Sequence, residues 1–188
     1  EFAAELGDLL GVLRHGLLPP AVRGGLEEGD ARRGCGEEHA VPDAAVAVVD
    51  EGDAIAEQLK VLQAADVPVL WRPLHEASGG WFWWGGQGSE AYVRLYRLLY
   101  DRLTNLHGLD NLIWVWNGQD AAWYPGDDVV DIIGEDIYPG ERVYTPQTAK
   151  FLEATQYTKE NKIIILSENG CLFDPDLALR DGSMWGLF

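Results

Sequence analysis

Two glutamates end apolar segments of the sequence, and their type and placement could support acid–base chemistry. Glu76 ends the segment VPVLWRPLHE, and Glu168 ends KIIILSE, 92 positions later. If both segments are parallel strands of a barrel, their carboxyl ends deliver the two carboxylates to one face, where barrel active sites lie. Glycoside hydrolysis needs such a pair: one carboxyl protonates the leaving oxygen, and the other attacks the anomeric carbon or activates water.

Aromatic residues follow the first of these glutamates. Trp81, Phe82, Trp83 and Trp84 form an unbroken block flanked by glycines, in a stretch too rich in glycine to be a helix. The C–H face of a pyranose ring stacks on indole, while its hydroxyl groups need polar neighbours. The block therefore predicts a sugar-stacking surface beside an acid catalyst, with Trp83 and Trp84 expected in the core and not on that surface.

Other motifs near these residues favour neither a metal nor a cofactor. Gly79 stands four positions after His75, where a His-Glu-x-x-His zinc motif requires a second histidine. The sequence has no Cys-x-x-Cys pair. A loose G-x-G-x-x-A match at 86–91 follows aromatic residues instead of a strand, which argues against dinucleotide binding. Asp136, at the end of another apolar run, is expected to have a structural hydrogen-bonding role.

The elements that would hold these residues alternate between strands and helices. The expected strands are apolar runs and not alternating patterns, which is typical of a parallel sheet covered on both faces. Such a sheet could be doubly wound or a (β/α)8 barrel, and ionisable residues at the ends of three strands favour the barrel. The expected strands are 44–49, 67–74, 111–117, 129–138, 162–168 and 184–188.

Helices are expected where apolar residues recur at helical spacing after a capping residue. Asp53 is a candidate N-cap for a helix that places Ile55, Leu59 and Leu62 on one face. Residues 1–50 are expected to form an atypical N-terminal segment, and residues 51–188 the catalytic region. Further helices are expected near 2–13, from Ser89 to a stop at Gly108, and from Thr145 and Pro146 to about Thr158.

The composition limits the partners of the chain. It has 188 residues, of which 47% are hydrophobic, and a net charge of −17. This charge argues against binding to nucleic acid, polyanions or anionic membranes, but it does not affect a neutral substrate. The absence of a run of about 18 apolar residues argues against a membrane span. Cys35 and Cys171 lie far apart in the sequence and are expected to be unpaired thiols, with a disulfide between them as the alternative.

Two of the segments resemble a known family. PVLWRPLHEASGGWFWWG and LSENG are similar to the two catalytic signatures of glycoside hydrolase family 26, the β-mannanases of clan A. The intervening HGLDNLIWVWN and WYPGDDVVDIIGEDIYPG are similar as well, so the resemblance extends from Asp53 to Phe188. It implies a (β/α)8 barrel and a retaining endo-β-1,4-mannanase that needs no cofactor. The implied substrate is β-mannan or a related neutral polysaccharide, and the implied location is extracellular.

The resemblance also implies a role for each candidate residue. Glu76 would be the general acid/base, and Glu168 the nucleophile. His75 would hydrogen-bond the sugar next to the scissile bond, Tyr138 would hold the nucleophile, and Trp81 would stack on the substrate close to the cleavage point. Arg72 and Trp116 would complete the pocket wall, so Trp116 is expected to face the pocket and Trp114 the helices.

The sequence departs from the family pattern at both ends. A complete barrel takes about 250 residues, and residues 1–40 show no pattern for the first two strands. We therefore expect an incomplete barrel with about six of the eight strands, the N-terminal ones being missing or aberrant. The alternatives to a mannanase are an inactive remnant that at most binds polysaccharide, and a β-1,3-xylanase or mixed-linkage glucanase of the same family.

Overall fold

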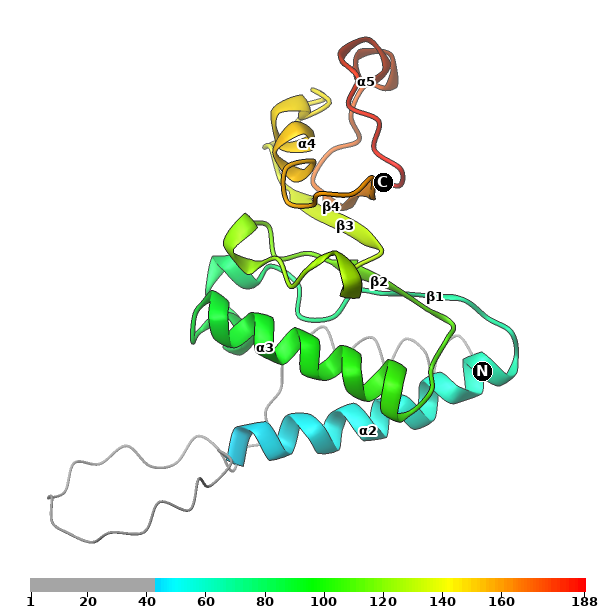
Figure 1. The fold of residues 1–188 in the computed structure, drawn as a ribbon. Coiled ribbons are helices and arrows are strands. Elements are labelled where there is room, and N and C mark those ends of the chain that lie inside the picture. The colour runs from blue at the N-terminus through cyan, green and yellow to red at the C-terminus, as the bar shows by residue number, and fades with distance from the viewer. Residues whose placement is uncertain (1–42) are drawn as a thin grey trace, which may run out of the picture. The chain divides into compact units, whose positions relative to one another are not determined.

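Four parallel strands form one sheet in the computed structural model, which describes residues 43–188, with side chains described from Gly52 onward (Figure 1). The strands are β1 (Val69–Trp71), β2 (Leu112–Trp116), β3 (Ile132–Ile137) and β4 (Ile163–Asn169). They lie in chain order, and every neighbouring pair is parallel. A doubly wound sheet would reverse its strand order at a switch point, whereas this unbroken order is that of a barrel. The expected fold class is confirmed, with the described strands forming a curled half-barrel.

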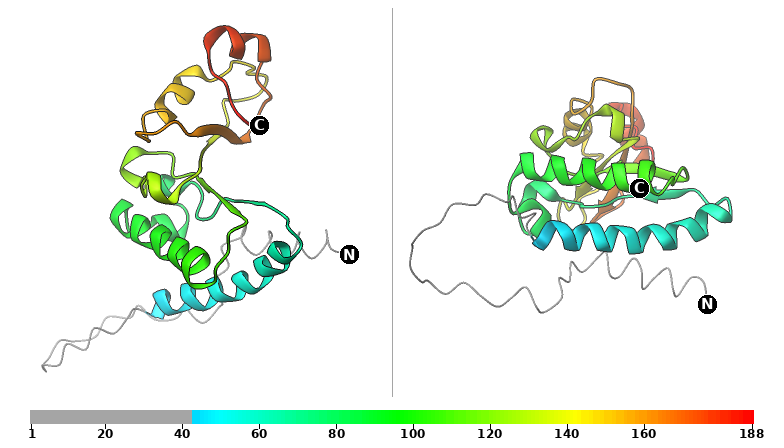
Figure 2. Two further views of the ribbon diagram at one scale, coloured as in Figure 1. Left: turned by 45° about the vertical axis from the view of Figure 1, so that its right-hand side comes forward. Right: turned by 60° about the horizontal axis from the view of Figure 1, so that its bottom comes forward.

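Helix α3 (Ser89–Tyr100) connects β1 to β2, and α4 (Thr148–Ala154) connects β3 to β4 (Figures 1 and 2). Tyr92 and Tyr96 of α3 are fully buried, and the Tyr96 ring lies 5.7 Å from the ring of Trp114 in β2. This aromatic layer packs α3 against β2 and leaves the carboxyl ends of the strands to polar residues. The helices are α2 (Asp43–Ala64), α3 (Ser89–Tyr100) with the π-helical turn Asp101–Leu106 that follows it, α4 (Thr148–Ala154) and α5 (Pro175–Asp181).

The first described helix begins earlier than the sequence pattern predicts. Residues 44–49, expected as a strand, belong to α2, because a short run of Ala and Val does not distinguish a helix from a strand. Asp53 therefore lies inside the helix and is not its N-cap. Its carboxylate lies 2.6 Å from Arg102 Nη2 and 2.8 Å from His107 Nε2, which ties α2 to the turn after α3. The helix expected near 2–13 lies outside the described residues.

The helix between β3 and β4 is shorter than expected. It begins at Thr148 and ends at Ala154, whereas the sequence predicts a start at Thr145 and an end near Thr158. Gln147 has a left-handed backbone with φ 53°, which interrupts the helical path. The Pro146 carbonyl also accepts a hydrogen bond of 2.9 Å from the Trp185 indole, a tertiary contact that the local sequence does not reveal.

The C-terminal segment pairs with the sheet without forming a strand. The Gly186 amide donates to the Ile164 carbonyl at 2.8 Å, and the Leu187 carbonyl accepts from Leu166 at 2.9 Å. The described residues thus contain four strands where the sequence predicts six. Helix α5 has no counterpart among the expectations, although Asp174 caps it and a proline follows the cap. No helix among residues 43–188 is long and apolar enough to cross a membrane.

Glu135 is a buried carboxyl in β3, and its burial makes the stability of the fold depend on pH. Its side chain is 1% exposed. Burial raises the pKa of Glu135 to about 7; Lys150 opposes this shift, while Glu153 and Asp136 reinforce it. In the unfolded chain the pKa of a glutamate is about 4.3. The folded state therefore retains its proton to a higher pH, and stability falls as the pH rises from about 4.3 to about 7.

We expect Glu135→Gln to remove this loss. The difference in melting temperature between the variant and the unmodified chain should increase by a few degrees as the pH rises from about 4.5 to about 8. In a domain of this length, a change of about 1 kcal/mol in stability shifts the melting temperature by about 2–4 °C. Circular dichroism melts across this range measure the difference. Glu141→Gln, at an exposed position after β3 that does not act on Glu135, is the matched control and should show no such trend. A pH-independent difference for Glu135→Gln would contradict the prediction.

Candidate active site

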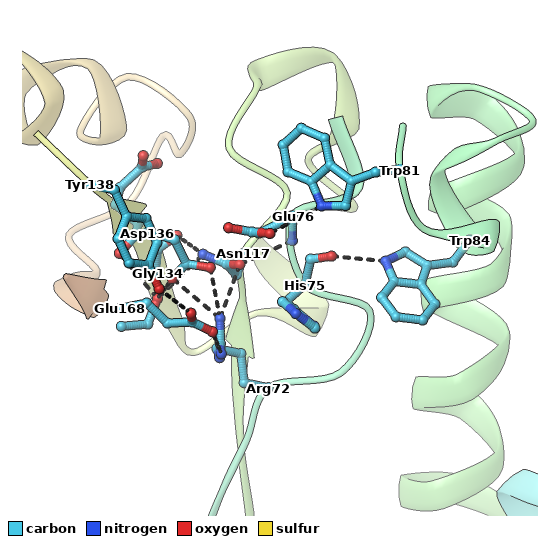
Figure 3. A network of polar contacts seen from close by, with 12 residues as sticks. Arg72, His75, Glu76, Trp81, Trp84, Asn117, Gly134, Asp136, Tyr138 and Glu168 are labelled. Atoms are coloured by element: carbon cyan, nitrogen blue, oxygen red, sulfur yellow. Dashed lines mark hydrogen bonds and ion pairs between the residues drawn. The ribbon is translucent and has the colours of Figure 1, made fainter. Parts of the chain in front are cut away.

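Polar residues from all four strands gather at the carboxyl end of the sheet (Figure 3). The register between β3 and β4 contributes to this, because an irregularity between Glu135 and Asp136 brings Asp136 opposite Glu168. A register shift of this kind re-aims side chains and is common next to active sites. The residues that gather are Arg72 and Glu76 after β1, Asn117 after β2, Asp136 and Tyr138 at the end of β3, and Glu168 in β4.

The carboxylate of Glu168 is held by two donors. The Tyr138 hydroxyl donates to Oε2 at 2.7 Å, and Arg72 Nη2 donates to Oε1 at 2.5 Å. Partial burial raises the pKa of Glu168, but the hydrogen bonds from Tyr138 and Arg72 outweigh it and leave the pKa below its usual value. The bond to Glu168 raises the pKa of Tyr138 to about 12, so the hydroxyl keeps its proton and remains a donor. Glu168 is therefore an ionised and oriented carboxylate at neutral pH.

Asp136 shares Arg72 with Glu168. Its side chain is fully buried, Arg72 Nη1 lies 3.0 Å from Oδ2, and the Ser167 hydroxyl donates to Oδ1 at 2.7 Å. Burial raises the pKa of Asp136 to about 6 against the lowering effects of Arg72 and Ser167, and Glu168 and Glu76 raise it further. These contacts place Asp136 behind Arg72 and agree with the structural role expected from the sequence.

The backbone at Glu76 is held in an unusual conformation. Its φ of 51° and ψ of 36° are left-handed, a region that few residues other than glycine adopt. The Glu76 amide donates to the Asn117 carbonyl at 2.7 Å and to Asn117 Oδ1 at 3.1 Å. Strain of this kind persists only where neighbouring groups hold it, and it clusters at functional sites. Figure 3 shows the Glu76 carboxylate beside the Trp81 indole and apart from the carboxylate of Glu168.

The glycine next to Trp81 explains how an indole can lie so close to Glu76. The Trp81 ring is packed on Gly79, where an added Cβ would meet it at 2.1 Å. The indole Nε1 donates to Glu76 Oε2 at 3.1 Å, while 66% of the Trp81 side chain remains exposed. An exposed indole face beside a carboxyl is suited to stacking against the apolar face of a sugar.

His75 is supported by the rest of the aromatic block. Its ring lies 4.7 Å from that of Phe82 and 5.7 Å from that of Trp84, and its carbonyl accepts from the Trp84 indole at 2.8 Å. Phe82 and Trp84 stack on each other at 4.4 Å. Trp84 is buried and supports the loop, as expected, whereas Trp83 is 38% exposed.

Trp116 does not face the pocket, contrary to the sequence-based expectation. It is fully buried, with its ring 5.0 Å from Tyr124 and 5.3 Å from Tyr157. Residues two apart on a strand point to the same face, so Trp116 lies on the same side as Trp114, which packs against the helices as expected. The next residue, Asn117, points into the site instead. Sequence reasoning missed it, although a polar residue directly after an apolar strand is a usable signal.

The described residues show no arrangement for a metal ion. No group of three or more His, Cys, Asp or Glu side chains in this part of the chain is placed to bind one. Cys171 is a free thiol whose sulfur contacts the Gly140 carbonyl at 3.4 Å. Cys35 lies outside the described residues.

Tyr138→Phe provides a test of how Glu168 is held. Loss of the donated hydrogen bond removes an interaction that favours the charged carboxylate, so the pKa of Glu168 should rise. A reaction that needs ionised Glu168 then loses its activity at a higher pH on the acid side. We expect the acidic limb of the kcat/KM profile to move upward by on the order of one pH unit. Tyr144→Phe, another exposed tyrosine, is the control. An unchanged limb in Tyr138→Phe would contradict the assignment.

Comparison with known proteins places these features in context. The sequence model of glycosyl hydrolase family 26 matches residues 39–188. The chain is 50% identical over 133 residues to a mannan endo-1,4-β-mannosidase of Thermothelomyces thermophilus, covering 71% of this chain and 27% of the relative. It is 40% identical over 141 residues to mannan endo-1,4-β-mannosidase B of Piromyces, covering 75% and 24%. The chain thus spans about a quarter of the length of these two relatives.

Solved structures of mannanases also match this chain. A GH26-CBM35 β-(1,4)-mannanase of Podospora anserina matches with a TM-score of 0.71 and 44% identity, over 79% of this chain and 33% of that one. A β-mannanase from a symbiotic protist of the termite Reticulitermes speratus, complexed with a gluco-manno-oligosaccharide, matches with a TM-score of 0.72 and 39% identity, over 81% and 46%. A β-1,3-xylanase of a Vibrio species is 30% identical over 124 residues, which cover 59% of this chain and 25% of that protein.

Proposed function

The chain belongs to glycosyl hydrolase family 26, and on this basis we propose that it supplies both catalytic carboxylates of a retaining endo-β-1,4-mannanase. The observation that carries the proposal is the unequal environment of the two glutamates. Glu168 is ionised and oriented by Tyr138 and Arg72, as a nucleophile requires. Glu76 lies across the site with its carboxyl bonded to the Trp81 indole, next to the exposed ring on which a sugar would stack.

The proposed reaction is a double displacement. Glu76 donates its proton to the glycosidic oxygen while Glu168 attacks the anomeric carbon, so the bond to the leaving sugar breaks as a glycosyl–enzyme ester forms. Glu76, now ionised, removes a proton from water, and the resulting attack on the anomeric carbon releases the product and restores Glu168. This path requires the two carboxyl groups to lie about 5–5.5 Å apart; about 6.5–9.5 Å would indicate inversion.

The other candidate residues have supporting roles in this proposal. His75, held by the aromatic block, would hydrogen-bond the sugar next to the scissile bond, and Trp81 would stack on the substrate close to the cleavage point. Arg72 uses its guanidinium to bind Asn117, Asp136 and Glu168, so we assign it to holding the nucleophile at the pocket wall.

The proposed substrate is a neutral β-mannan. Two curated relatives are named as mannan endo-1,4-β-mannosidases, and one related structure was solved with a gluco-manno-oligosaccharide. The net charge of −17 does not hinder an uncharged polymer. A polysaccharide does not cross a cell membrane intact, which supports an extracellular location. The similarity to a Vibrio β-1,3-xylanase makes xylan hydrolysis the second candidate.

A hydrolysis panel tests the proposal. The purified chain, and a form extended at both ends, would be incubated with β-mannan, glucomannan, β-1,3-xylan and mixed-linkage glucan. We expect the extended form to release manno-oligosaccharides whose β configuration at the new reducing end is seen first by proton NMR. The chain alone should be slower, because its described residues form four of the eight strands that close a barrel. The control is the Glu76→Gln, Glu168→Gln double variant. Hydrolysis of xylan alone, or of no polymer, would refute a mannanase.

A further inference from the structure

Asn117 is a buried residue at the centre of the polar network in Figure 3, and the proposed mechanism assigns it no role. It is fully buried and lies directly after β2. Its Oδ1 accepts from Arg72 Nη1 at 3.2 Å and from the Glu76 amide at 3.1 Å. Its Nδ2 donates to the Gly134 carbonyl at 2.8 Å and to the Ser167 hydroxyl at 3.3 Å.

These four bonds use the full capacity of the side chain. An amide offers two donor hydrogens and an oxygen that accepts two bonds, and Asn117 has a partner for each. Fully satisfied buried networks make the local structure rigid. The partners come from the loop after β1, from β3 and from β4, so one side chain links the segments that carry both catalytic carboxylates.

We infer that Asn117 is a positioning residue that sets the placement of Glu76 relative to Glu168, an inference that rests on the proposed function of this site. It acts on Glu76 by holding the amide of a residue whose backbone is left-handed. It acts on Glu168 through Arg72, which binds Asn117 and Glu168 through different nitrogens of one guanidinium. Because the guanidinium is planar and rigid, a shift at Asn117 moves the nitrogen that holds the nucleophile.

Other residue types would not preserve this arrangement. Alanine leaves the Gly134 carbonyl and the Glu76 amide without their side-chain partner, and aspartate places an acceptor opposite the Gly134 carbonyl. A misplacement of about 1 Å can lower a rate about 10²-fold. We therefore expect Asn117→Ala to lower kcat about 10²-fold and to change KM by less than about threefold, because Asn117 is buried and touches no substrate.

A double-mutant cycle separates positioning from a general structural effect. The substrate for the cycle is an activated aryl β-mannoside. Its leaving group needs little help from an acid, so Glu76→Ala retains measurable activity. In that background the loss caused by Asn117→Ala should be smaller than in the unmodified protein, because one of the groups that Asn117 positions is already absent. Asn111→Ala is the matched control: it lies at the opposite end of β2, where its side chain also donates to a carbonyl, that of Val67. Additive losses in the cycle would overturn the inference.

A second measurement does not depend on turnover. The indole N–H of Trp81 donates to the Glu76 carboxylate, so its NMR resonance, assigned with Trp81→Phe, reports where that carboxylate lies. In Asn117→Ala we expect this resonance to move toward its position in Glu76→Ala, and in Asn111→Ala to stay in place. Asn117→Asp, which keeps the volume of the side chain, replaces the alanine variant if that variant does not fold. It should move the resonance as well.

The outcomes distinguish the two claims. If the unmodified protein hydrolyses no sugar, the proposed function fails, and the Trp81 resonance still decides the role of Asn117. If the resonance stays in place in a folded Asn117 variant, Asn117 does not position Glu76, whatever the protein hydrolyses.

Discussion

Glu168→Ala is expected to abolish hydrolysis in an active form of this protein, by on the order of 10⁶-fold in kcat, the size of effect known for loss of a catalytic nucleophile. The reason lies in the contacts of Glu168. Tyr138 and Arg72 each donate to one oxygen of its carboxylate and lower its pKa. The carboxylate is therefore charged and oriented for attack. Alanine removes the atom that would form the bond to the anomeric carbon. Glu168 is the β4 residue paired with Asp136, and no other described carboxylate takes this place.

The measurement uses an activated aryl β-mannoside and covalent labelling. A 2-fluoro mannosyl fluoride should add one sugar to the peptide that contains Glu168 in the unmodified protein and none in the variant. Added azide should restore aryl release in Glu168→Ala and give a mannosyl azide of inverted configuration, because azide then attacks directly in a single displacement. Glu168→Gln, which keeps the size of the side chain beside Arg72, checks that the loss is not caused by unfolding. Labelling at another residue would refute Glu168 as the nucleophile.

The sequence was sufficient to predict the residues at the strand ends but not how they are held. Long apolar runs such as KIIILSE predict buried parallel strands, and the glutamates that end them lie where a barrel places its active site. The contact of Tyr138 with Glu168 was expected from the family resemblance, and the structure shows it. The links through Arg72 and Asn117 join residues that are 17 to 96 positions apart, and local patterns contain no signal for such distant pairs.

Two of the incorrect predictions have a common physical cause. The segment 44–49 and the start of α4 were assigned from short local patterns, and tertiary contacts decided otherwise: Asp53 of α2 is bound to Arg102, and Pro146 is bound to Trp185. The orientation of Trp116 follows from the alternation along β2 once Trp114 is known to face the helices. Local propensity is a weak guide where a few long-range contacts fix the backbone.

Glu76→Ala is expected to produce a loss that depends on the leaving group. A positioned general acid contributes about 10²–10⁴-fold, and this help matters most when the departing oxygen is a poor leaving group, as in mannan. We therefore expect kcat/KM to fall by about 10³-fold or more on polymer and by less than about tenfold on a dinitrophenyl mannoside, whose phenolate leaves without a proton. Glu90→Ala, at an exposed position at the start of α3, is the control and should change neither rate.

The stereochemistry of azide rescue distinguishes Glu76 from Glu168. In Glu76→Ala the nucleophile is intact, so the glycosyl–enzyme still forms from the activated substrate and accumulates because no base activates water. Azide needs no base, and its attack on this intermediate is a second displacement, which gives a mannosyl azide of retained configuration. The same anion must therefore yield opposite anomers with the two variants. Equal losses on polymer and aryl substrate, or an inverted azide product from Glu76→Ala, would remove Glu76 from the role of acid/base and leave the Trp81 indole bonded to a carboxylate that does not react.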